Sequence, residues 1–64
     1  MKSRMDKRQK FYRVYNNLPL NFREEVIVVV SGEPITWKVA KLEIDSETKI
    51  GDEILNKLDF LKII

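Results

Sequence analysis

The 64-residue chain contains no cysteine and no histidine. Without these side chains it forms no disulfide, no cysteine or serine–histidine nucleophile and no imidazole metal site. Its only two glycines, Gly32 and Gly51, stand apart in the sequence, so no glycine-rich phosphate loop is present. We therefore expect neither an enzyme acting alone nor a cofactor.

Long apolar runs are also missing. The longest, Val26 to Val30, is far too short to span a membrane, and no apolar segment follows the basic N-terminus as in a secretory signal. These absences predict a soluble cytoplasmic protein. Glu43, Asp45 and Glu47 alternate in a way that suits hard cations, but the glycine and final glutamate of a calcium loop do not follow. We interpret these three carboxylates as a solvated turn.

The small size of the chain favours self-association. A domain of this length buries only about 60 % of the surface that its unfolded chain exposes. Disulfides and zinc are excluded, so oligomerisation is the remaining device that stabilises very small proteins, and we expect a homodimer. Lysine and glutamate dominate the charged residues and only one glutamine is present, a composition that favours a thermophilic origin.

Positive charge is concentrated at the N-terminus. Residues 1–13 carry six cationic side chains against one carboxylate, whereas residues 14–64 carry six against nine. We predict a flexible basic arm over residues 1–10 and a single domain over residues 11–64. Such an arm can bind nucleic acid or an acidic protein surface, or it can be a solvated tail. The candidate nucleic-acid contacts are Lys2, Arg4, Lys7, Arg8, Lys10, Tyr12 and Arg13.

Apolar residues at helical spacing predict a helix at each end of the domain. The apolar positions of the first helix are Phe11, Val14, Tyr15 and Leu18. The packed part of this helix is expected to begin near Lys7 to Lys10 and to end before Pro19. Thr48 is the expected N-cap of the last helix, whose stripe consists of Ile50, Ile54, Leu58 and Leu61. Phe60 and Ile63 fall outside this stripe. Either the helix ends near Asp59 or these side chains contact a second subunit, and the apolar tail over residues 60–64 is expected to be docked.

Residues 25–44 predict a β-hairpin. The β-branched run Val26–Val30 precedes the turn formers Ser31 to Pro34, and we favour a four-residue loop because Pro34 lacks an amide hydrogen. This register pairs Val30 with Ile35, Val28 with Trp37 and Val26 with Val39, all on one apolar face.

The alternation changes phase at Val39-Ala40. A β-bulge is the favoured interpretation, and the alternative is a new pairing that makes residues 41–44 an edge for another subunit. The second face of the hairpin, with Ile27 and Val29, is half apolar and needs either a helix or a second subunit to cover it.

Together these patterns predict an α+β domain of order α-β-β-α, with an antiparallel hairpin packed against two helices. The expected function is a non-catalytic protein-interaction or assembly module, homodimeric. The alternative is a nucleic-acid-binding protein, and a third option is a subunit that completes an enzyme's site in a larger complex. The candidate interface residues are Ile27, Val29, Leu42, Ile44, Phe60 and Ile63.

Overall fold

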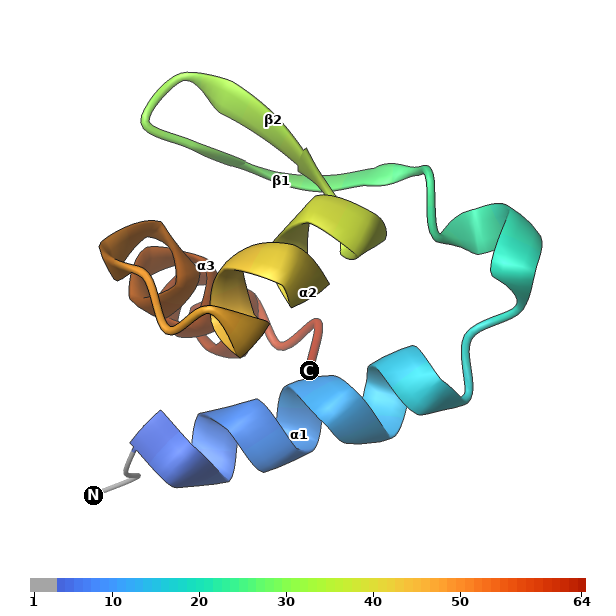
Figure 1. The fold of residues 1–64 in the computed structure, drawn as a ribbon, viewed down its shortest axis with the longest axis horizontal. Coiled ribbons are helices and arrows are strands. Elements are labelled where there is room, and N and C mark those ends of the chain that lie inside the picture. Colours follow the sequence, from blue (N-terminus) through green and yellow to red (C-terminus); the bar gives the residue numbers. More distant parts are fainter. Residues whose placement is uncertain (1–3) are drawn as a thin grey trace.

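A computed structural model describes residues 4–64, with the side chains of residues 7–64. The elements follow in the order α1 (Arg4–Asn16), a 3-10 turn η1 (Leu20–Phe22), β1 (Val26–Val30), β2 (Glu33–Thr36), α2 (Trp37–Asp45) and α3 (Lys49–Phe60). The predicted α+β class and the order α-β-β-α are confirmed, with α2 as an additional helix. The hairpin lies on one side of α2 and α3, and α1 lies on the other (Figure 1). Within residues 4–64, no helix has the length and apolar character to cross a membrane.

The hairpin turns over two residues, Ser31 and Gly32. Their φ angles of 53° and 79° are both positive, as a type I′ turn requires, and Val30 pairs with Glu33. The predicted four-residue loop is therefore wrong. Pro34 pairs with Val29, which is a position without hydrogen bonds between the strands, because the neighbouring pair closes the turn. The missing amide hydrogen of Pro34 thus costs the ladder nothing.

One face of the hairpin forms part of the core. Val28 pairs with Ile35 and not with Trp37, so the register differs from the predicted one by two residues. A shift of two residues leaves each side chain on the same face of the strand. Val28, Val30 and Ile35 are therefore buried, as predicted. The ladder is irregular between Val26 and Val28, and Val26 is 57 % exposed. The predicted apolar face is wrong for Val26, and also for Val39, because the strand ends before that residue.

The predicted second strand becomes helix α2 at Trp37. The side chain of Thr36 caps this helix by accepting a hydrogen bond from the backbone N–H of Val39, at 3.1 Å. Trp37, Ala40 and Ile44 are its buried residues, and their spacing of three and four is helical. The phase change at Val39-Ala40 is thus the start of a helical period. Both the β-bulge and the second pairing are wrong.

Both later helices end in a left-handed residue that is not glycine. After α2, Glu47 has a φ of 54°, and the backbone N–H of Thr48 donates to the carbonyl of Glu43 at 3.2 Å. After α3, Lys62 has a φ of 60°, and the N–H of Ile63 closes the equivalent bond. These are Schellman motifs, which satisfy the last carbonyls of a helix. Each requires its left-handed residue to accept backbone strain.

Helix α2 lies close to helix α3 at Gly51. This residue is buried, and a Cβ atom added to it would lie 2.6 Å from the carbonyl oxygen of Glu43. The predicted N-cap of α3 is confirmed, because the hydroxyl of Thr48 accepts from the N–H of Gly51 at 2.9 Å. The same hydroxyl donates to Glu43 Oε1 at 2.6 Å. The hydroxyl of Thr48 therefore links the end of α2 to the start of α3.

The core lies between the three helices and the inner face of the hairpin. Its most deeply buried large side chains come from all three helices: Phe11, Ile44, Ile54 and Leu58. The ring of Phe11 also contacts those of Tyr15 and Trp37, with centroids 5.7 and 5.9 Å apart.

The predicted stripe of the last helix is half right. Ile54 and Leu58 are buried, but Ile50 and Leu61 are 44 % and 50 % exposed. The predicted docking of the C-terminal tail holds for Ile63 and Ile64, which pack partly against the core. It does not hold for Phe60, which is 82 % exposed.

Candidate interaction surfaces

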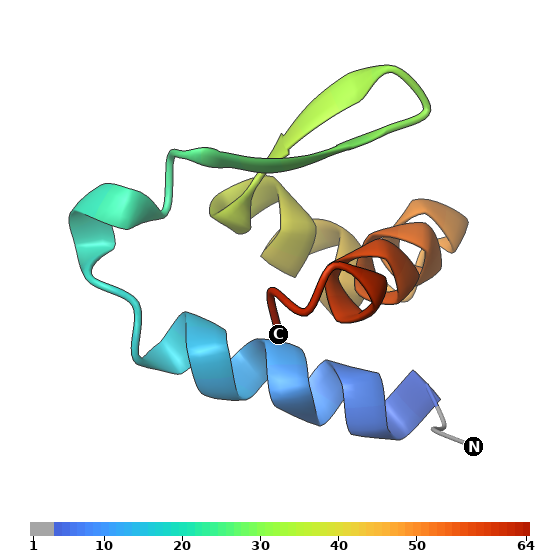
Figure 2. The same ribbon diagram turned by 180° about the vertical axis from the view of Figure 1, so that it is seen from behind.

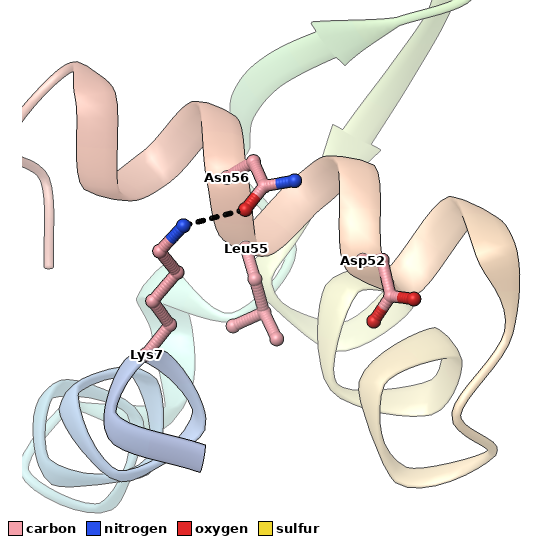
Figure 3. A pocket seen from close by; sticks show the side chains of 4 residues that line it. All are labelled: Lys7, Asp52, Leu55 and Asn56. Atoms are coloured by element: carbon pink, nitrogen blue, oxygen red, sulfur yellow. Dashed lines mark hydrogen bonds between the residues drawn. The ribbon is translucent and has the colours of Figure 1, made fainter. Parts of the chain in front are cut away.

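Two basic residues of α1 contact helix α3. Helix α1 begins at Arg4, so the arm boundary predicted at residue 10 falls inside a helix. Lys7 donates to Asn56 Oδ1 at 2.7 Å, as Figure 3 shows, and Lys10 forms an ion pair with Asp59. These contacts join α1 to α3. Lys2 and the side chain of Arg4 lie outside the part of the chain that the structure describes.

A second set of contacts joins α1 to α2 and its following turn. Arg8 forms an ion pair with Glu47, with its Nη1 atom 3.6 Å from Glu47 Oε2. The guanidinium carbon of Arg8 also lies 5.9 Å from the ring centroid of Tyr12. The hydroxyl of Tyr12 donates to one oxygen of Asp45, and Lys41 donates to the other at 2.7 Å. Of the predicted nucleic-acid contacts, Lys7, Arg8, Lys10 and Tyr12 thus have partners within the chain. Arg13 is exposed.

The pKa shifts in this set of contacts have a local cause. The hydrogen bond from Lys41, followed by the one from Tyr12, lowers the pKa of Asp45 below its ordinary value. The pKa of Lys41 is raised by the same hydrogen bond to Asp45. Burial, followed by the hydrogen bond to Asp45, raises the pKa of Tyr12. The three shifts therefore report one polar contact between α1 and α2.

A shallow hollow lies between α1 and α3 (Figure 3). It is lined by Lys7, Asp52, Leu55 and Asn56, and its volume is about 230 Å³. Ligand pockets typically measure about 300–1,000 Å³. The bond between Lys7 and Asn56 also crosses this hollow, so we interpret it as part of the helix contact. Among the residues that the structure describes, no three carboxylates come together as a metal site.

The predicted candidate interface residues separate into three groups. Val29, Leu42 and Phe60 are exposed, at 49 %, 59 % and 82 %. Ile27 and Ile63 are half-buried and pack against the core. Ile44 is 1 % exposed, so its assignment to the surface is wrong: it lies on the inner face of α2. Residues 41–44 form no strand edge, because they belong to helix α2.

The two real edges of the hairpin are both obstructed. On β2, Pro34 has no amide hydrogen to offer to another strand. On β1, the amino group of Lys57 in α3 donates to the carbonyl of Val29 at 2.5 Å. Proline and lysine are devices by which natural sheets prevent edge-to-edge pairing. An interaction surface is therefore expected away from the sheet edges.

Among the side chains that the structure describes, the most exposed large apolar one lies at the end of α3. Phe60 and the adjacent Leu61 are 82 % and 50 % exposed. They lie one turn beyond Lys57, whose amino group reaches Val29. We call Phe60 and Leu61 the α3-end surface. The helix ends within one residue of the end predicted near Asp59, but the prediction of Leu61 as core is wrong, because its side chain is half exposed.

No protein-family model, no curated protein and no solved structure matches this chain. Its function is therefore inferred from its own residues.

Proposed function

We propose that this protein is a small non-catalytic assembly module that forms a homodimer through the α3-end surface. The observation that carries this proposal is the 82 % exposure of Phe60. Burying a phenylalanine side chain contributes about 1.5–3 kcal/mol of favourable free energy. In a monomer of this fold Phe60 stays in water, so burial in an interface would stabilise the dimer. Aromatic side chains are enriched at the centre of protein interfaces.

Leu61 extends the apolar area, because it follows Phe60 directly and is 50 % exposed. A two-fold dimer places the same patch on both partners, so Phe60 of each partner would pack against the apolar surface of the other. A standard interface buries about 800 Å² on each partner. That area is about a fifth of the 4461 Å² surface of this chain.

Mass measurement tests the proposal. Light scattering from micromolar to millimolar concentration should give a mass twice the 7.6 kDa of one chain. Phe60→Ser should give the monomer mass while keeping the helical circular dichroism, because the side chain is exposed. Leu20→Ser is the matched control, since Leu20 is 75 % exposed on η1 and lies outside the α3-end surface. A monomeric wild type, or a dimer that Phe60→Ser leaves intact, refutes the proposal.

The nucleic-acid alternative has less support, because three of its cations contact side chains of this chain: Lys7, Arg8 and Lys10. Titration of labelled DNA and RNA at several salt concentrations tests it. Binding that weakens steeply with salt and is reduced in Arg13→Glu would favour the alternative over the assembly module. The cytoplasmic location and the thermophilic origin inferred from composition stay predictions.

A further inference from the structure

A second apolar surface lies at the other end of α3. A groove of about 350 Å³ separates the hairpin from α2 and from the start of α3. Val30 and Ile35 form its buried floor, while Val39 and Ile50 line it with 39 % and 44 % of their surfaces exposed. The turn of the hairpin projects over the N-terminal end of α3 in both views (Figures 1 and 2). The volume lies within the usual range for ligand pockets.

This groove is distinct from the α3-end surface. Ile50 lies in the first turn of α3 and Phe60 is its last residue. At 1.5 Å per residue, the two positions are about 15 Å apart along the helix axis. An occupant of the groove therefore leaves Phe60 free to form the proposed dimer.

Charge at the groove has one sign. Glu33 of β2 and Glu43 of α2 line it, and no cationic side chain among the described residues 7–64 does. Glu33 is exposed, and Glu43 accepts the hydroxyl of Thr48 with one oxygen at 2.6 Å. A carboxylate accepts several hydrogen bonds, so Glu43 keeps acceptor capacity for another donor. An apolar floor beneath two carboxylates is complementary to an alkyl chain that ends in a cation.

We propose that the groove binds a hydrophobic segment of a partner protein that carries a lysine. In this arrangement an apolar side chain of the partner packs between Val39 and Ile50. The adjacent lysine extends toward Glu33 and Glu43. The apolar contact supplies affinity, and the two carboxylates select a cationic neighbour over an anionic one.

Three capped peptides test the proposal: leucine-leucine-lysine, leucine-leucine-glutamate and serine-serine-lysine. Each is titrated into the full chain, and the methyl NMR signals of Val39 and Ile50 are followed. The leucine-leucine-lysine peptide should shift these signals in a saturable manner. At low salt its dissociation constant should be lower than that of the glutamate peptide by a factor of about three or more. The serine peptide should bind more weakly still. Equal binding of the lysine and glutamate peptides, or no shift of either methyl signal, overturns the proposal.

Two variants assign the selectivity. Glu33→Gln combined with Glu43→Gln should remove the preference for lysine while leaving the leucine-dependent shifts, since glutamine at 43 retains an oxygen for Thr48. Glu25→Gln, at an exposed position before β1, should leave the preference unchanged. A preference that survives the double substitution refutes the role of the two carboxylates.

A second copy of this chain is the competing occupant. If the same methyl shifts appear in the wild type on concentration alone, without peptide, the groove binds another copy and the proposed partner is wrong. Repeating the titrations with Phe60→Ser separates this result from the proposed dimer. Peptide binding in that variant supports the groove even if the dimer proposal fails.

Discussion

Replacing Gly51 by alanine tests the close approach of α2 and α3. The added Cβ would lie 2.6 Å from the carbonyl oxygen of Glu43, whereas ordinary contact begins at 3.4 Å. The helices must therefore separate by about 0.8 Å along that direction. The obstacle is backbone, so rotating a side chain cannot relieve it. The same carbonyl accepts the N–H of Thr48, so its displacement also strains the end of α2.

Two opposing contributions decide the sign of the effect. Alanine is favoured over glycine inside a helix by about 1 kcal/mol. Overpacking a well-filled core costs about 1–3 kcal/mol, and here a backbone hydrogen bond is strained as well. We expect Gly51→Ala to lower the free energy of unfolding by about 1–2 kcal/mol. For a domain of this size that corresponds to a fall in Tm of about 5–15 °C.

Urea and thermal unfolding followed by circular dichroism measure this change. The matched control is Glu53→Gly compared with Glu53→Ala, in the same helix at a half-buried position, where alanine should be the more stable by about 1 kcal/mol. If Gly51→Ala is as stable as the wild type, or more stable, the close approach of the two helices is not as described.

Three further predictions concern the helix ends and the contact between α1 and α2. Lys62→Gly should raise the free energy of unfolding by about 0.5–1 kcal/mol, because glycine adopts the left-handed conformation without strain; a loss of stability in urea would contradict this. Thr48→Ala should lower the free energy of unfolding by about 1 kcal/mol through loss of the N-cap, and an unchanged urea midpoint would contradict the capping role. The pKa of Asp45 is lowered in the fold, so its carboxylate stabilises the protein above the ordinary pKa of 3.8, and this contribution is lost as the pH falls through the lowered value. Between pH 3.8 and that lowered value, stability should therefore fall less steeply with decreasing pH in Asp45→Asn than in the wild type, and identical profiles would contradict the contacts of this carboxylate.

Local signals predicted the parts of the fold that local interactions determine. Thr48 was found as an N-cap because its side chain bonds to a backbone group three residues away. Val28, Val30 and Ile35 were assigned to the inner face because alternation survives a register error of two residues. The missing amide hydrogen of Pro34 predicts a longer loop, but Pro34 pairs with Val29 at a position in the ladder that needs no donor.

The stretch after Thr36 was ambiguous. Tryptophan, valine and isoleucine favour strands, and the alternation of residues 40–44 fits one. Trp37, Ala40 and Ile44 fit a helix equally well, and packing against α3 decides between them. The partners of the basic residues in α1 could not be predicted from local sequence patterns. Lys7 and Lys10 each contact a residue 49 positions later, and only the tertiary fold brings them together.

Helix α1 is joined to β1 by a nine-residue connection, residues 17–25, and packs mainly on α3. An element attached in this way can leave its site without unwinding and be replaced by the same helix of another copy, which is the geometry of domain swapping. Such an exchange would reproduce, between two chains, the contact of Phe11 with Trp37 and that of Tyr15 with Lys41. A swapped dimer would be independent of Phe60 and would form on refolding at high concentration. Its slow return to monomer on dilution would distinguish it from the rapid equilibrium of a surface dimer.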